Sequence, residues 1–344
     1  PSDVWARERR VKELMGEAVL GKAKARPSVE APLHEAMPWT YVVHLHPTLV
    51  NGMTCAVDGA SACARLFPDA LWIEYVDPGY TLARCVAGRL AESAKSGRRA
   101  PNVVFLQNHG VFVGAQTLPE VARLYEQMLA RLAETYRAAG VAVELAVGGR
   151  DEEAVLAAAP RLRGLAAAGG GPATVAAGAD WFAPAIGPLS PDHIVYAKSY
   201  PYTGELTPAA MAGFVRQHGY APRLAAVAGR AVFGIGDSLK AARAALVAGR
   251  DAALVQQLTA AFVGPRCLDE RERSFIENWE VESYRQKVGA GEAAARRVAG
   301  KVCVVTGAAQ GFGLGIARGM AAEGAVVFLA DLNVEGAKSE AAAI

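Results

Sequence analysis

Three histidines lie where their side chains could bind one metal ion. His44 and His46 are two residues apart near the end of a predicted strand over residues 41–46. Because side chains alternate along a strand, both imidazoles point to the same face. His109 lies where a second apolar strand, over residues 102–106, breaks into a loop. Three imidazoles without a cysteine suit a catalytic zinc site that keeps one position for substrate, although an HxH pair alone more often consists of polar histidines at a strand end.

An acidic residue and the order of three short motifs change this interpretation. Glu30 precedes the HxH pair, and a glycine follows the third histidine. This order resembles the class II aldolase/adducin family over about residues 25–145. The motifs that carry the resemblance are Pro27-Ser-Val-Glu30, His44-Leu-His46-Pro47 and Leu106-Gln-Asn-His109-Gly110. The resemblance implies that His44, His46 and His109 bind the metal, Zn²⁺, and that Glu30 is the acid/base of the site.

The chemistry of a sugar-phosphate aldolase agrees with these residue types. Zinc is a Lewis acid on the ketose carbonyl, and it stabilises the enediolate that forms as the carbon–carbon bond breaks. A carboxylate must move the proton, and Glu30 occupies the family's position for it. A glutamate early in a helix is also favoured by the helix dipole, so a structural role stays open, and His34, one helical turn later, is a second candidate. The family's phosphate-binding loop is not found before Pro27.

A glycine-rich turn near the end of the chain predicts a dinucleotide site. A predicted strand over 301–306 enters the turn, a helix over 314–323 follows, and a second strand leads to Asp331. Glycines let the backbone approach a pyrophosphate at the helix N-terminus, and an acidic residue after the second strand binds ribose hydroxyls, which favours NAD over NADP. The alternative is a tight structural turn. The candidate cofactor-binding residues are Thr306, Gly307, Gly311, Gly313 and Asp331.

This pattern resembles the short-chain dehydrogenase/reductase family over about 45 residues. That family's Ser and Tyr-xxx-Lys catalytic set would lie beyond Ile344, so we expect an incomplete domain that cannot transfer hydride. The order of parts resembles the bifunctional rhamnulose-1-phosphate aldolase/lactaldehyde dehydrogenase type. It implies zinc-dependent aldol cleavage of a rhamnulose-1-phosphate-like sugar phosphate, fused in the full-length protein to an NAD-dependent aldehyde/alcohol oxidoreductase. The alternatives are an epimerase or dehydratase that uses the same metal site, and a non-catalytic adducin-like module.

The expected fold class is α/β, with three parts. These are a class II aldolase-like α/β/α domain, a small α/β middle domain and an incomplete Rossmann fold. The predicted boundaries are 1–165 for the zinc domain, 180–265 for the middle domain, 266–299 for a helical connector and 300–344 for the start of the Rossmann domain. Glycine-rich linker composition at 167–172 suggests the first boundary. We also expect a strand over 194–197 and a long polar helix over 270–286.

The composition excludes some classes of partner. Lys and Arg number 36 against 34 Asp and Glu among 344 residues, and this formal charge of +2 gives no reason to expect a nucleic-acid or acidic-membrane partner. The 52% of hydrophobic residues suffice for packed cores, and the longest run that has neither a charged residue nor a histidine, 164–179, is too weakly apolar to span a bilayer. With no secretory signal at the start and five cysteines without CxxC spacing, we expect a cytoplasmic protein with reduced thiols. We also expect a homo-oligomer.

Overall fold

The structure is a computed structural model with a mixed α/β fold, and it describes residues 3–21, 27–97, 99–168, 173–279 and 296–344. Contacts within the chain define two compact units. The first consists of Pro1–Ala146, Gly187–Pro191 and Asp251–Val281. The second consists of Val147–Ile186, Asp192–Arg250 and Glu282–Ile344. None of the helices in the described ranges is both long and apolar enough to cross a membrane.

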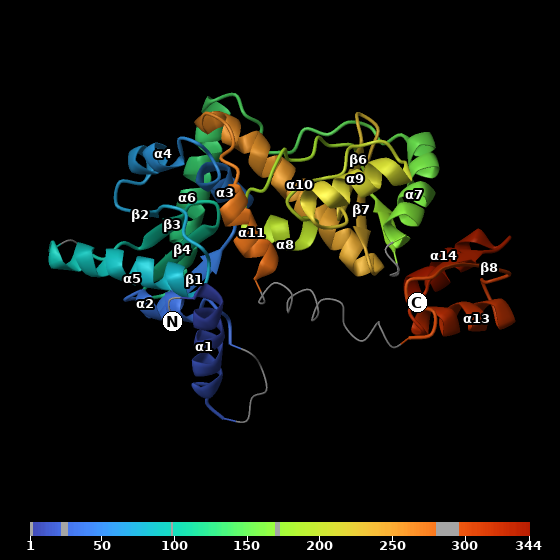
Figure 1. The fold of residues 1–344 in the computed structure, drawn as a ribbon, viewed down its shortest axis with the longest axis horizontal. Helices are drawn as coiled ribbons and strands as arrows, with labels where there is room; N and C mark the ends of the chain where they lie inside the picture. The colour runs from blue at the N-terminus through green and yellow to red at the C-terminus, as the bar shows by residue number, and fades with distance from the viewer. Residues whose placement is uncertain (1–2, 22–26, 98, 169–172, 280–295) are drawn as a thin grey trace. The chain divides into compact units, whose positions relative to one another are not determined.

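A four-stranded sheet forms the centre of the first unit (Figure 1). Along the sheet, the strands are ordered β1 (Tyr41–Leu45), β4 (Gly110–Ala115), β3 (Val103–Leu106) and β2 (Leu71–Ile73). β4 pairs antiparallel with both β1 and β3, whereas β2 pairs parallel with β3. The sheet therefore places the end of β1 beside the turn between β3 and β4, where the sequence has its three candidate histidines.

Helices cover both faces of this sheet, because the central strands are apolar on both sides. Phe105 and Val111, which are register partners, face a core formed with α3 (Thr48–Thr54) and α6 (Leu118–Ala138). Val104 and Phe112, the next pair, face the opposite core. The helices of that second core are α2 (Ala31–Ala36) and α5 (Tyr80–Lys95). Successive strand residues thus point to opposite cores, and the result is the expected α/β/α layering.

The other helices of the first unit include α1 (Val4–Glu17), α4 (Gly59–Leu66) and α11 (Glu270–Asn278). A capping box begins α11: the side chain of Asp269 accepts from the backbone N–H of Glu272, and the side chain of Glu272 accepts from the backbone N–H of Asp269. The helix ends at Asn278, earlier than the predicted 270–286, and 280–286 lie outside the described residues.

A three-stranded antiparallel sheet organises the second unit. The strands are ordered β5 (Thr174–Ala177), β7 (Ala231–Gly236) and β6 (Leu224–Val227). One face packs on α7 (Glu152–Ala167) and α9 (Pro208–His218). On the other face, a Cβ at Gly234 would collide with the backbone of Ala242 in α10 (Leu239–Thr259), so only glycine permits this close packing. A short 3₁₀ helix, η1 (Ala260–Phe262), follows α10.

Two details of this unit differ from the sequence predictions. The predicted strand over 194–197 is wrong, because these residues form the end of helix α8 (Pro191–Ala197). A proline at the first helical position and Asp192 in the first turn favour a helix there, and they outweigh the β-branched Ile194 and Val195. The predicted zinc domain, 1–165, includes α7, whereas α7 packs on β5 and β7 of the second unit.

The C-terminal residues form a β-α-β arrangement followed by a helix. The parallel strands β8 (Val302–Thr306) and β9 (Val326–Ala330) are joined by α13 (Gly311–Ala322), and α14 (Val334–Ala343) ends the chain. Val305, Ala308 and Ala317 form a small core between these elements. The strand, glycine turn, helix and second strand occur in the order that the sequence predicts.

Candidate metal centre

The four residues that the sequence places in a metal site come together at one end of the first unit's sheet. His44 lies in β1, His46 directly follows this strand, and His109 lies in the turn between β3 and β4. Glu30 is the residue immediately before α2. One ligand atom from each of these four residues lies within 4.8 Å of the others. Three separate segments of the chain therefore supply one cluster of three nitrogen donors and one oxygen donor.

The ring of His44 is held with one nitrogen toward the cluster. Its Nδ1 lies 3.0 Å from the backbone oxygen of Val111, and a carbonyl only accepts, so Nδ1 donates this hydrogen bond. The ring also stacks on Phe112, with centroids 3.9 Å apart and an interplanar angle of 10°. The lone pair of Nε2 is left for the cluster, and this is the usual arrangement of a metal-binding histidine.

Glu30 reaches the cluster from the first turn before α2. Its Oε1 lies 3.3 Å from Nε2 of His109 and 3.5 Å from Nε2 of His44. The helix that follows, α2, packs through Leu33, which is fully buried in the core that α2 and α5 form with the sheet. His34, the second acid/base candidate, is not part of the cluster and instead contacts the edge of Phe112, with ring centroids 5.2 Å apart.

The turn that carries His109 has unusual backbone requirements. Asn108 has a φ of 53°, in the left-handed region that asparagine tolerates better than most residues. At Gly110, a Cβ would collide with the ring of His46 and would lie 2.7 Å from the backbone oxygen of Leu45. The left-handed backbone at position 108 and the lack of space for a Cβ at position 110 therefore explain the asparagine and the glycine that flank His109.

The electrostatic setting favours a neutral His109 beside the ionised carboxylate of Glu30. Burial lowers the pKa of His109 to about 4, so this ring is neutral near pH 7. Burial alone would raise the pKa of Glu30, but hydrogen bonds and charge interactions with His109 and His44 outweigh it and hold that pKa well below its ordinary value. A neutral ring and an anionic oxygen are the forms that bind a divalent cation.

The donor set fits a zinc ion. Donors bound to one tetrahedral zinc ion at about 2.1 Å lie about 3.4 Å apart. The separations of Glu30 from His109 and His44, 3.3 and 3.5 Å, agree with this value. Nε2 of His46 and Nε2 of His44 are closer, at 2.8 Å, and would separate slightly around an ion. Glu30 lies near enough to be a fourth ligand as well as a base.

A second candidate site lies at the glycine-rich turn. Gly307 and Gly311 have φ values of 63° and 58°, and a Cβ at Gly313 would collide with the carbonyl group of Gly307. Thr306 ends β8 before this turn. Asp331, just after β9, accepts hydrogen bonds from the backbone N–H groups of Ala309 (3.0 Å) and Asn333 (2.9 Å), and these bonds lower its pKa. A tight glycine backbone beside a half-buried carboxylate fits a dinucleotide.

Comparison with known proteins identifies the class of the first unit. Residues 6–136 match the family model described as Class II Aldolase and Adducin N-terminal domain. The N-terminal part of the chain therefore contains a class II aldolase/adducin domain, and the candidate ligands His44, His46 and His109 and the acid Glu30 all lie within it. Members of this class that act as aldolases depend on a metal, in agreement with the cluster described above.

Two curated proteins and one solved structure are similar to the chain. The "Uncharacterized oxidoreductase YuxG" of Bacillus subtilis is 26% identical over 381 residues, which cover 96% of this chain and 54% of that protein. This chain thus spans about half the length of that relative. The "Galactitol 2-dehydrogenase" of Agrobacterium fabrum is 52% identical over 48 residues, 14% of this chain and 19% of that protein. The N-terminal class II aldolase domain of a conserved protein from Thermoplasma acidophilum has 20% identity and a TM-score of 0.33, over 37% of this chain and 56% of that one.

Sequence reasoning missed two residues that are linked to the turn around His109: Nη1 of Arg266 donates to Oδ1 of Asn108 at 2.7 Å, and Nη2 of Arg266 donates to Oε1 of Glu272 at 2.8 Å. Arg266 and Glu272 lie far along the chain from this turn and outside the matched residues 6–136. The Asp269-to-Glu272 spacing is visible in the sequence as a capping box, but it does not show what the helix contacts.

Proposed function

We propose that the first unit is a zinc-dependent aldolase that cleaves a sugar phosphate. The observation that carries this proposal is the convergence of three imidazoles and one carboxylate within 4.8 Å in a class II aldolase/adducin domain. We assign His44, His46 and His109 as the metal ligands. A scaffold without catalysis has no need of three convergent imidazoles, and this argues against the adducin-like module.

The residues of the cluster divide the work in this proposal. Zinc, when bound, supplies a Lewis acid for the carbonyl of a ketose. Glu30 accepts and returns the proton at Oε1, because its carboxylate is ionised and lies 3.3 Å from Nε2 of His109. The hydrogen bond from Nδ1 of His44 to the Val111 carbonyl keeps the ring from rotating during this transfer.

The substrate class follows from the resemblance of the motifs and their order. We propose a rhamnulose-1-phosphate-like ketose phosphate, cleaved to an aldehyde and a three-carbon ketose phosphate. An epimerase or dehydratase would use the same metal site. Product analysis separates them: incubation with ketose phosphates gives two fragments for a lyase, a stereoisomer for an epimerase, and loss of water for a dehydratase. The His46→Ala variant is the control, since a product that it still forms at the wild-type rate does not come from this site.

We also propose that residues 300–344 begin an NAD-dependent dehydrogenase domain. The support is the glycine backbone at Gly307 and Gly313, the carboxylate of Asp331, and similarity to two proteins named as an oxidoreductase and a dehydrogenase. Such a domain could oxidise the aldehyde that the aldolase releases. Titration of the full-length protein with NADH, followed by fluorescence, tests this assignment, and no binding would refute it.

We propose that the protein works in the cytoplasm as a homo-oligomer and has no nucleic-acid partner. The formal net charge of +2 supports the last of these statements.

A further inference from the structure

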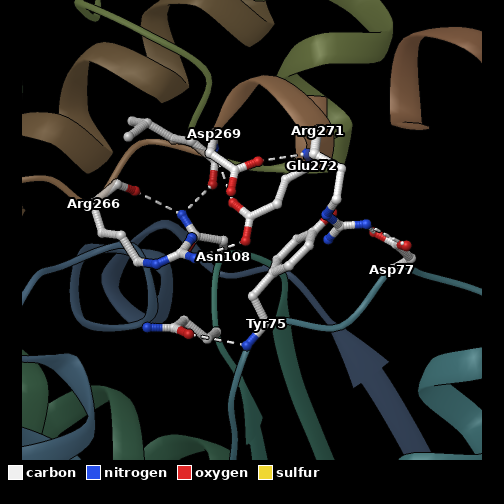
Figure 2. A network of polar contacts seen from close by, with 9 residues as sticks. Tyr75, Asp77, Asn108, Arg266, Asp269, Arg271 and Glu272 are labelled. Carbon is white, nitrogen blue, oxygen red and sulfur yellow. Dashed lines mark hydrogen bonds and ion pairs between the residues drawn. The ribbon is translucent and has the colours of Figure 1, made fainter. Parts of the chain in front are cut away.

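Asn108, the residue before His109, is fully buried and uses its side chain to join two distant segments (Figure 2). Its Nδ2 donates to the backbone oxygens of Leu189 and Arg266, each at 2.8 Å. Its Oδ1 accepts from Nη1 of Arg266 at 2.7 Å. Both amide hydrogens and the amide oxygen therefore have partners, and these partners lie 81 and 158 residues further along the chain.

Arg266 is in turn fixed by a second set of contacts. Its Nη2 donates to Oε1 of Glu272 at 2.8 Å, and its guanidinium lies over the ring of Tyr75, 5.6 Å from the centroid. The side chain of Glu272 is nearly buried, and its Oε2 accepts from the backbone N–H of Asp269 at 2.9 Å. Figure 2 shows Arg266 between Asn108 and Glu272. The guanidinium group of Arg266 therefore connects the first turn of α11 to the Asn-His-Gly turn.

The contacts matter because Asn108 has a left-handed backbone. A φ of 53° is unfavourable for a residue with a side chain, so the conformation persists only where its surroundings fix it. The three side-chain hydrogen bonds supply that constraint, together with a bond from the Asn108 backbone N–H to the Thr54 carbonyl at 2.9 Å. The direction of the next side chain, His109, depends on this backbone.

We propose that Arg266 and Glu272 are positioning residues of the metal centre, which hold Asn108 and thereby aim Nε2 of His109 at the donor cluster. The inference rests on the proposed metal site. It goes beyond the class II aldolase/adducin domain, because both residues lie outside the matched range 6–136. A segment that follows this domain along the chain therefore completes the geometry of the domain's metal site.

Arg271, on the helix that carries Glu272, provides a matched comparison for Arg266. It forms a two-pronged ion pair with Asp77, at 3.0 and 2.8 Å, and its side chain is 63% exposed. In Figure 2 it points to Asp77, whereas Arg266 points to Asn108. Substitution of Arg271 removes an arginine and its contact between α11 and the domain, but leaves the Arg266–Asn108 hydrogen bond in place.

The test compares Arg266→Met, Glu272→Gln and Arg271→Met with the wild type, all in the whole chain. Three quantities are measured: the Kd for zinc by competition with a chromophoric chelator, the visible absorption spectrum of bound cobalt(II), and thermal unfolding of the metal-free protein. Removal of residues that orient metal ligands typically costs 10–100-fold in metal affinity. We expect about this loss for Arg266→Met with a changed cobalt spectrum, a smaller loss in the same direction for Glu272→Gln, and wild-type values for Arg271→Met.

The cobalt spectrum separates positioning from general destabilisation, since it reports ligand geometry in molecules that have folded and bound the ion. Glutamine at position 272 can still close the capping box, so Glu272→Gln decides the question if Arg266→Met does not fold. The proposal is overturned if the folded variants of Arg266 and Glu272 bind both ions as the wild type does. It is also overturned if Arg271→Met causes the same changes. A wild-type protein that binds neither ion would instead refute the metal centre itself, and the positioning role with it.

Discussion

The imidazole of His46 lies directly against the backbone of Gly110. A Cβ at position 110 would collide with Cδ2 of this ring and lie 3.2 Å from its Nε2. Leu45, the residue before His46, pairs with Val111, the residue after Gly110, so the antiparallel register of β1 and β4 produces this contact. The pairing of Leu45 with Val111 therefore places two of the three candidate ligands, His46 and His109, close together.

Gly110→Ala is expected to displace His46 and weaken zinc binding. The new methyl group also approaches the Leu45 carbonyl to 2.7 Å, so the pairing of β1 and β4 must shift. We expect a loss of roughly 1–3 kcal/mol in the free energy of unfolding, as for other over-packed sites, and a lower zinc content. Gly88→Ala in α5 is the control: a Cβ there has no atom within 4 Å, so stability should stay equal or rise. Wild-type zinc content in Gly110→Ala would contradict this account.

His46→Ala is expected to lose the metal while the fold persists. The wild type should carry about one zinc per chain through His44, His46 and His109. The matched control is His34→Ala, since His34 lies near the site but outside the donor cluster. Elemental analysis after gel filtration gives the zinc content, and circular dichroism checks the fold. Unchanged zinc in His46→Ala, or loss in His34→Ala, would show that the ligand assignment is wrong.

Much of the candidate site could be predicted because its signals are local. The period of two along a strand places His44 and His46 on one face, and the break after a strand places His109 in a turn. The structure brings these residues and Glu30 into one cluster. The role of Arg266 could not be predicted, since its contact with Asn108 spans 158 residues and depends on how α11 packs.

Secondary structure could be predicted where a segment carries one clear signal, and not where strand and helix signals occur in the same segment. The apolar run predicted as a strand at 102–106 forms β3 (Val103–Leu106), but the sheet order β1-β4-β3-β2 comes from pairing between residues far apart in sequence. The segment around Ile194 has β-branched residues and also a helix start at Pro191, and the helix formed. Helix α7 was not recognised, because its alanine-rich sequence has weak apolar periodicity.

Glu30→Gln is expected to retain zinc and lose most of the turnover. The three imidazoles remain, so the metal should bind, although more weakly if the carboxylate is also a ligand. An amide cannot accept the proton at this position, and loss of a positioned acid/base lowers turnover by roughly 10²–10⁴. Zinc content and the initial rate of ketose phosphate cleavage by the full-length protein are the measurements. A rate equal to that of the wild type would move the role to another residue, with His34 the next candidate.

The metal-free protein is expected to lose stability as the pH falls from 7 to 5. An unfolded histidine takes up a proton near pH 6.5, whereas folded His109 does so only near pH 4, because burial lowers its pKa. The unfolded state therefore binds more protons in this window, and the folded state becomes less stable as the pH falls. The contribution of His109 should be about 2 kcal/mol. Urea unfolding at pH 7 and pH 5 measures it, and His109→Gln should show a smaller decrease; an equal decrease would assign the effect to other groups.

Asp331 is expected to determine the choice of dinucleotide. Its carboxylate is half-buried beside the glycine-rich turn, and the hydrogen bonds from Ala309 and Asn333 keep it ionised by lowering its pKa. An anion there accepts hydrogen bonds from free ribose hydroxyls and repels a 2′-phosphate, so the full-length protein should prefer NAD to NADP. Asp331→Ser removes the charge and should reduce this preference, by roughly tenfold. Glu335→Gln is the matched control, because it removes one negative charge nearby that pairs with Lys338. Titrations with NADH and NADPH give the ratio of dissociation constants, and thermal unfolding checks that the lost backbone contacts have not unfolded the domain. If Asp331→Ser leaves the ratio of dissociation constants unchanged in a folded protein, the carboxylate does not select the cofactor and only stabilises the turn through its hydrogen bonds.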